Sequence, residues 1–236
     1  MRADEPALRI RSLRKTFTLH LRGGVRLDAL RGVDLDLFPA ECVVLRGPSG
    51  AGKSTLMRCV YGNYAADSGS IRVAHNDATV ELVGAAPRQV HELRRGTLGY
   101  VSQFLRVIPR VSAIDIVAEP LLSRGVTEAD ARKRAAALLE RLNIPSRLFD
   151  LPPATFSGGE QQRVNIAHVF IARYPILLLD EPTASLDDAN RAVVIDLIQE
   201  ARRDGAAILA ILHDATAREA LATRIFELTP RLAEVA

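Results

Sequence analysis

The sequence lacks several features that mark particular classes of protein. It has only two cysteines, Cys42 and Cys59, among 236 residues. Each lies in an apolar pattern, so we expect two small core residues in a reducing compartment rather than a disulfide or a metal pair. No apolar run approaches the roughly 18 residues that cross a bilayer, and residues 1–6 lack the apolar core of a signal peptide. These absences predict a cytoplasmic chain with no direct membrane insertion.

Charge of one sign is not in large excess either. The 31 Lys and Arg residues against 28 Asp and Glu residues give a net charge of +3. A nucleic-acid-binding protein more often gathers its basic residues on one stripe. Here the densest basic groups, at 132–134 and 202–203, fall within amphipathic helical patterns and fit solvated helix faces. No nucleic-acid partner is therefore predicted.

Short apolar runs give the first indication of the fold. Residues 8–37 alternate between apolar and polar and include turn signals at Gly23-Gly24 and Gly32, which predicts antiparallel strands. Continuous apolar runs at 42–45, 176–179 and 207–212 predict strands that are buried on both faces. Such strands are typical of a parallel sheet covered by helices.

Helical patterns separate these strands. Residues 53–61 and 189–203 predict helices, and Thr127 is placed to cap another. Strands that alternate with helices predict an α/β sheet whose site lies at the carboxyl edge. With no internal repeat or low-complexity linker, we predict one domain over 1–236, with about 104–165 as a helical subdomain inserted in its core.

A glycine-rich turn follows the first buried strand. Residues 47–54 read Gly-Pro-Ser-Gly-Ala-Gly-Lys-Ser and match the phosphate-binding loop pattern in full. Glycines let successive backbone N–H groups turn toward an anion, and the following helix adds its positive end. Lys53 would contact the β- and γ-phosphates, and Ser54 would ligate magnesium. The predicted nucleotide-binding residues are Gly47, Pro48, Ser49, Gly50, Ala51, Gly52, Lys53, Ser54 and Thr55.

Two acids end the second buried run. Asp180 follows Leu177-Leu178-Leu179 directly, and Glu181 is the next residue. Asp180 is placed to enter the coordination shell of magnesium, and Glu181 to polarise the attacking water as the base. With the loop upstream, the pair predicts an ATP-hydrolysing site that uses ATP and Mg²⁺.

The residues just upstream of these acids carry a resemblance to a known family. The run Phe156-Ser157-Gly158-Gly159-Glu160-Gln161-Gln162-Arg163 resembles the signature motif of ATP-binding-cassette (ABC) ATPases. Ser157 is placed to cap a helix, which leaves the Gly158 and Gly159 amides free to face a phosphate. The resemblance implies an α/β fold, that of the P-loop NTPase ABC nucleotide-binding domain, with an antiparallel β subdomain and a helical signature subdomain. It also implies that Ser157, Gly158 and Gly159 face the γ-phosphate bound by a second subunit, so that one chain holds half of each active site.

Further positions match the pattern of this family. Gln103 resembles the glutamine that contacts magnesium and water, and His213 resembles the switch histidine that contacts the γ-phosphate. Phe17 resembles the aromatic residue that stacks on adenine. Ser185-Leu186-Asp187 resembles the loop that crosses the dimer interface. The resemblance thus implies Glu181, His213 and Gln103 as catalytic residues and Ser54, Gln103 and Asp180 as magnesium ligands.

A narrower resemblance concerns the role of the ATPase. Residues 102–110, and Phe156 in place of the usual Leu, are similar to the PhnL branch, which is associated with the bacterial carbon–phosphorus lyase system for phosphonate use. That branch implies an accessory ATPase with soluble lyase subunits as partners. The alternative is the ATPase subunit of an export or lipoprotein-release transporter, with 104–122 as the surface that meets a membrane partner. A chromosome- or repair-type ABC ATPase is a third interpretation, and the sustained heptads that it requires are missing.

The expected mechanism is shared by the first two interpretations. Two subunits would close around two ATP molecules and reopen after hydrolysis. The sequence leaves open whether the second ABC subunit is a like or a related chain. It also leaves open what the ATP-driven motion accomplishes.

Overall fold

The computed structural model describes residues 5–19, 25–103 and 110–228. Its strands are β1 (Leu8–Leu19), β2 (Val25–Leu37), β3 (Cys42–Arg46), β4 (Ser68–His75), β5 (Ala78–Glu81), β6 (Leu98–Val101), β7 (Ile176–Asp180), β8 (Ala207–Ile211) and β9 (Arg224–Glu227). Its α-helices are α1 (Lys53–Val60), α2 (Pro87–Gly96), α3 (Ala113–Leu122), α4 (Glu128–Arg141), α5 (Gly158–Phe170), α6 (Asp188–Arg203) and α7 (Ala215–Leu221). Residues 104–109, part of the predicted partner-facing segment, and the predicted turn at Gly23-Gly24 lie outside the described residues.

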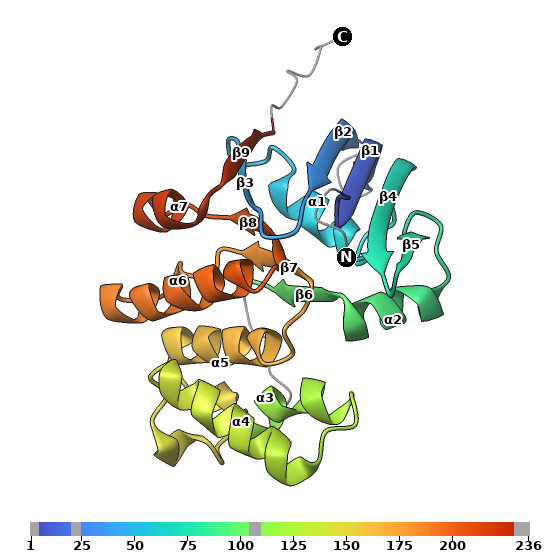
Figure 1. The fold of residues 1–236 in the computed structure, drawn as a ribbon. Coiled ribbons are helices and arrows are strands. Elements are labelled where there is room, and N and C mark those ends of the chain that lie inside the picture. The colour runs from blue at the N-terminus through green and yellow to red at the C-terminus, as the bar shows by residue number, and fades with distance from the viewer. Residues whose placement is uncertain (1–4, 20–24, 104–109, 229–236) are drawn as a thin grey trace.

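The strands form two sheets, which Figure 1 shows at an angle to each other. One is antiparallel with the order β2-β1-β4-β5, and the other is parallel with the order β6-β7-β8-β3-β9. The predicted antiparallel strands and buried parallel strands are both confirmed. The parallel order places the ends of β3, β7 and β8 next to each other at one edge, and the predicted site residues follow those ends.

Alternation along the parallel strands divides the core into two halves. Cys42 and Val44 of β3 pack with the helices α3, α5 and α6, whereas Val43 and Leu45 pack with α1 and the antiparallel sheet. Because successive side chains of a strand point to opposite faces, a sheet covered on both sides needs apolar residues at every position. This explains why these strands read as continuous apolar runs.

Both cysteines are free and buried, as predicted. Burial raises the pKa of Cys42 to about 12 and that of Cys59 to about 11. Thiols with such pKa values stay protonated at neutral pH and behave as small apolar side chains. Within the described ranges, no helix is long and apolar enough to cross a bilayer.

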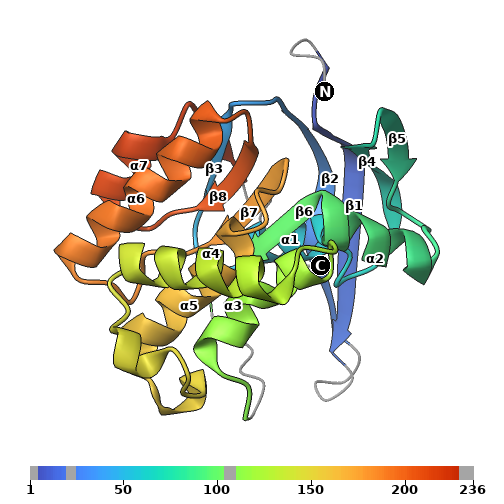
Figure 2. The same ribbon diagram turned by 60° about the horizontal axis from the view of Figure 1, so that its bottom comes forward.

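The helices between β6 and β7 gather on one side of the parallel sheet. Figure 2 shows α3, α4 and α5 close together, and α3 contacts both of the other two. Thr127 caps α4 as predicted, with its side chain accepting a hydrogen bond from the Asp130 N–H. The assignment of 104–165 as an inserted subdomain stays a prediction, because it also includes undescribed residues.

Some elements differ from the sequence-based expectation. Gly32, predicted as a turn, lies inside β2 with φ 90°, next to register shifts between β1 and β2. A left-handed glycine at such a bulge lets the strand continue. No sequence pattern indicated α2, α7 or β9.

Candidate active site

The predicted phosphate-binding loop connects β3 to α1, and two of its glycines are required by close backbone contacts. Gly47 has φ 152° and Gly52 has φ 94°. A Cβ on Gly47 would lie 2.3 Å from the carbonyl oxygen of Leu228, and one on Gly52 would lie 2.3 Å from that of Ala29. Both φ values and both contacts favour glycine, so these residues hold the loop against the backbone on either side of it.

The first turn of α1 is available to an anion. Its N-cap, Gly52, makes no side-chain capping hydrogen bond, so the first N–H groups of the helix are not capped by it. The Lys53 Nζ donates hydrogen bonds to the carbonyl oxygens of Gly47 at 2.8 Å and Pro48 at 3.0 Å. The ammonium group therefore lies over the loop, and the positive end of the helix dipole points the same way.

Asp180 ends β7 at the same sheet edge and is 4% exposed. The Tyr100 hydroxyl donates a hydrogen bond to its Oδ2 at 3.2 Å, and the Ser54 side chain also hydrogen-bonds to it. Burial raises the pKa of Asp180 above its usual range, while these two hydrogen bonds act in the opposite direction. Ser54 and Asp180, both predicted as magnesium ligands, are thus in contact.

The chemistry around Asp180 fits magnesium. Mg²⁺ prefers hard oxygen ligands and usually takes one or two protein carboxylates together with substrate phosphates and water. In the described part of the chain, no group of three or more His, Cys, Asp or Glu side chains is arranged to hold a metal ion. A hydroxyl and one carboxylate therefore fit an ion that is completed by phosphate oxygens.

Glu181 adopts a backbone conformation that is uncommon for a residue with a side chain. Its φ is 54°, and its N–H donates to the carbonyl oxygen of Ile211 at 3.1 Å. Its Oε1 lies 3.0 Å from the Nε2 of His213, which follows β8 by two residues. Non-glycine residues in this region cluster at functional sites. The predicted base and the predicted switch histidine are brought into direct contact.

The predicted signature residues lie at the start of α5. Ser157 is its N-cap and forms a capping box with Glu160, whose Oε2 accepts from the Ser157 N–H at 2.8 Å. Ser157 and Gly158 are exposed, and a Cβ on Gly158 would have no neighbour within 4 Å. The end of this helix is therefore open to a ligand or to another chain.

Gly159 lies against the predicted interface loop Ser185–Asp187. A Cβ on Gly159 would lie 2.9 Å from the carbonyl oxygen of Ser185. Asp187, the last residue of the loop, caps α6 by accepting from the Asn190 N–H at 2.8 Å. The two segments predicted to meet a second subunit are therefore packed together in one chain.

Two further predicted residues are Gln103 and Phe17. Gln103 is exposed directly after β6, and the preceding Ser102 carbonyl oxygen accepts a hydrogen bond from the Asn165 side chain at 2.8 Å. Phe17 is half-buried on β1, with the Tyr64 ring 5.3 Å away in a T-shaped contact. The roles of Gln103 as a magnesium contact and of Phe17 as an adenine platform stay predictions.

Two side chains that contact these residues were not predicted from the sequence. Tyr100 reaches Asp180 from 80 positions away, and no local pattern indicates such a contact. Asn190 hydrogen-bonds to the Asp187 side chain. Its spacing of three from Asp187 is that of an N-cap partner, so a signal for this contact was present.

Comparison with known proteins identifies a family. Residues 30–184 match the sequence profile of the family described as ABC transporter. The chain is 41% identical over 212 residues to the lipoprotein-releasing system ATP-binding protein LolD of Novosphingobium aromaticivorans, covering 89% of this chain and 91% of that protein. It is 39% identical to LolD 2 of Caulobacter vibrioides, covering 89% and 90% of the two chains.

Solved structures agree with this match. The dimeric post-hydrolysis structure of the ATP-binding cassette MJ0796 bound to ADP and Pi superposes with a TM-score of 0.84 at 27% identity, covering 94% of each chain. A second dimeric structure of MJ0796, described as a bacterial ABC transporter cassette, gives a TM-score of 0.85 with the same coverage. The chain therefore belongs to the ABC transporter family and is an ATP-binding-cassette ATPase, which hydrolyses ATP to ADP and phosphate.

Proposed function

We propose that this ATPase works as a dimer that drives a transporter of the lipoprotein-release or export class. The dimer is proposed because the start of α5 is open. Ser157 and Gly158 are exposed there, on a different element from the phosphate-binding loop. The Ser157 side chain caps the Glu160 N–H, and the preceding N–H groups at this helix start favour phosphate. In the proposed dimer, the Ser157–Gly159 segment of each subunit contacts the γ-phosphate held by the loop of the other.

The residues at the carboxyl edge would divide the chemistry among them. Lys53 would hold the β- and γ-phosphates, and Ser54 and Asp180 would hold magnesium, which neutralises developing charge on the phosphates. Glu181 would orient the attacking water and accept its proton. His213, 3.0 Å from Glu181, would turn to the γ-phosphate when ATP is bound.

Similarity to relatives favours a membrane partner. The two LolD proteins are named as components of lipoprotein-releasing systems, and the matches extend over about nine tenths of this chain. We propose the same class of partner here, a permease that the closing dimer moves. This proposal holds whether the second ABC subunit is an identical or a related chain.

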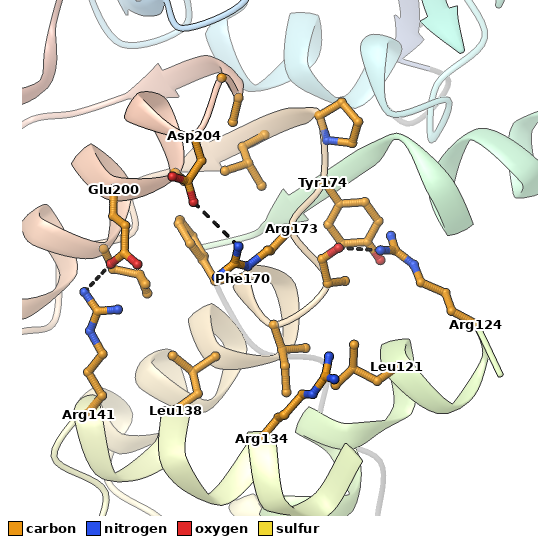
Figure 3. A pocket seen from close by; sticks show the side chains of 18 of the residues that line it. Leu121, Arg124, Arg134, Leu138, Arg141, Phe170, Arg173, Tyr174, Glu200 and Asp204 are labelled. Carbon is orange, nitrogen blue, oxygen red and sulfur yellow. Dashed lines mark hydrogen bonds and ion pairs between the residues drawn. The ribbon is translucent and has the colours of Figure 1, made fainter. Parts of the chain in front are cut away.

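A groove at the other end of β7 from Asp180 supports this partner. It has a volume of about 1160 Å³ and lies between α4, the end of α5 and the end of α6 (Figure 3). An apolar floor with a charged rim suits a docked protein segment, because burial supplies affinity and charge selects the partner. The lining includes the apolar Leu121, Leu138 and Phe170 and the arginines Arg124, Arg134, Arg141 and Arg173. Glu200 and Asp204 also line it and pair with Arg141 and Arg173, which leaves an excess of positive charge. We propose that a short acidic segment of the permease occupies it.

The second candidate is an accessory ATPase of the carbon–phosphorus lyase system. It rests on the resemblance of residues 102–110 and Phe156 to the PhnL branch. The LolD relatives support the transporter proposal better. The two candidates differ in whether the partner is a membrane protein or a set of soluble lyase subunits.

Copurification with a groove variant distinguishes the candidates. Leu138→Glu places a negative charge among the arginines of the groove, and Ala137→Glu places the same charge on the exposed neighbouring position of α4. We expect the native chain and Ala137→Glu to be recovered from membranes in a detergent-stable complex with a permease, and Leu138→Glu to lose that complex. A stable complex with soluble lyase subunits and no membrane protein would refute the transporter proposal.

A further inference from the structure

One side chain connects the two segments that the proposed dimer uses. The Asn190 Nδ2, in the first turn of α6, donates to both carboxylate oxygens of Asp187 at 2.9 Å. Its Oδ1 accepts from the Arg163 Nη1 at 2.9 Å and from the Asn143 Nδ2 at 3.1 Å. The amide thus donates to the interface loop and accepts from the signature helix and from the segment that follows α4.

Arg163 carries this connection to the signature residues. It lies on α5 with only 9% of its surface exposed, and its Nε donates to the Gly159 carbonyl oxygen at 3.2 Å. Its Nη1 also donates to the carbonyl oxygens of Leu142 at 3.0 Å and Asn143 at 2.8 Å. A buried guanidinium is costly unless its donors are satisfied, so these bonds fix its position and that of Gly159.

The two connected segments also touch directly. Because a Cβ on Gly159 would lie 2.9 Å from the Ser185 carbonyl oxygen, the start of α5 cannot move toward the loop without displacing it. Hydrogen bonds thus connect Gly159 through Arg163 and Asn190 to Asp187, and the close approach of Gly159 to Ser185 is a second connection between the same two segments. Closely packed elements of this kind shift between discrete arrangements and not gradually.

We propose that Asn190 is a positioning residue that makes the signature end of α5 and the loop Ser185–Asp187 move as one unit when the dimer closes. The proposal rests on the ATP-driven dimer proposed above. Its physical basis is that the amide nitrogen of Asn190 donates to a carboxylate, while the amide oxygen accepts from a guanidinium. Neither Ala nor Asp can satisfy both.

The test uses ATP-induced dimerisation in the full-length Glu181→Gln chain, in which hydrolysis is expected to be blocked. Asn190→Ala removes both connections. Asn190→Asp keeps an acceptor for Arg163 but sets a carboxylate against that of Asp187. Asp196→Ala, at an exposed position of the same helix, is the matched control. The measurements are the ATP concentration at half-dimerisation by light scattering, the nucleotide affinity of the monomer at low protein concentration, and the Tm.

We expect Asn190→Ala and Asn190→Asp each to raise the half-dimerisation concentration of ATP about tenfold, a typical size for coupling between sites. Monomer affinity should not change, the control should match the parent, and Asn190→Asp should keep a Tm near that of the parent. Native dimerisation of Asn190→Asp would reduce Asn190 to a structural anchor of Arg163 and overturn the proposal. Native dimerisation of Asn190→Ala would also overturn it. So would a loss of nucleotide affinity in the monomer as large as the change in the half-dimerisation concentration. If the Glu181→Gln parent itself failed to dimerise, the proposed function would fail, and this inference with it.

Discussion

Individual side chains of the predicted site are held in place by the protein's own groups. Lys53 is bonded to two loop carbonyl oxygens, and Ser54 and Tyr100 both contact Asp180. Glu181 contacts His213. Groups that are already oriented need little rearrangement when charge develops on a phosphate, which is a large part of how such sites accelerate reactions.

Removing the lysine of the loop tests the nucleotide site directly. We expect Lys53→Ala to weaken Mg-ATP binding by about 10- to 100-fold, since a charge-assisted hydrogen bond contributes about 1.5–3 kcal/mol and each 1.4 kcal/mol is a factor of ten. Lys133→Ala, at an exposed position of α4, changes the net charge equally and should bind normally. Titration calorimetry measures both, and equal affinity of the two variants would refute the assignment of the loop.

Asp180→Asn should separate stability from activity. The raised pKa of Asp180 means that the folded chain holds this proton more tightly than the unfolded chain, so its stability falls as pH rises through the window between the two pKa values. Asp180→Asn removes that buried charge. We therefore expect a higher Tm than the native chain at pH 7.5, a difference that shrinks as the pH is lowered through the folded pKa toward the unfolded pKa, and a loss of ATPase activity of about 10- to 100-fold. A Tm difference that does not depend on pH would contradict the origin of the pKa shift.

Residue types and spacing indicated much of this site, but not its contacts. Parallel strands end at one edge, which was enough to expect Asp180, Glu181 and His213 near the loop. The direct contact of Glu181 with His213 and the hydrogen bond from Tyr100 depend on side-chain directions that the register of distant strands fixes. No local pattern reports that register.

At the scale of elements, α5 has two glycines in its first turn that face different surroundings. A Cβ on Gly158 would meet no atom within 4 Å, whereas one on Gly159 would lie 2.9 Å from the backbone of Ser185. One glycine is therefore required by packing within the chain. The other is not, and its open surroundings agree with the proposed approach of a partner's phosphate.

This difference predicts opposite effects of two similar substitutions. Gly158→Ala should leave the free energy of unfolding unchanged or raise it by up to about 1 kcal/mol, because Ala favours helix over Gly. Its ATPase activity should fall at least about tenfold, because the methyl group obstructs a γ-phosphate from the partner. Gly159→Ala should lose about 1–3 kcal/mol of stability through overpacking. Urea unfolding and phosphate release measure these effects, and full activity of Gly158→Ala would contradict an interface at this helix end.

Elements with a strong local signal were predictable, and those that depend on partners were not. The apolar runs of β3, β7 and β8 and the cap and apolar face of α4 are visible in the sequence. In contrast, α2 buries only Leu93, and β9 is largely exposed and is a strand because it pairs with β3. A short helix with so few apolar residues and an exposed edge strand give little apolar pattern to detect.

At the scale of the whole molecule, the nucleotide edge and the groove bordered by α4 lie at opposite ends of β7. The phosphate-binding loop, Asp180 and Glu181 lie at the first, and α4, α5 and α6 border the second. Since α5 begins at the signature residues and its last turn lines the groove, a rigid movement of this helix would reach both. This arrangement suits an ATPase that converts closure on ATP into motion of a docked partner.

In the proposed dimer, ATP brings two chains together so that each active site is completed by both, and Glu181 acts only in the completed site. The most direct measurement is light scattering of the Glu181→Gln chain after size exclusion, with Mg-ATP or with Mg-ADP. We predict a dimer with Mg-ATP, a monomer with Mg-ADP, normal ATP binding and a turnover rate at least about 100-fold below that of the native chain. A chain that stays monomeric with saturating Mg-ATP, or that hydrolyses ATP at the native rate, would contradict it.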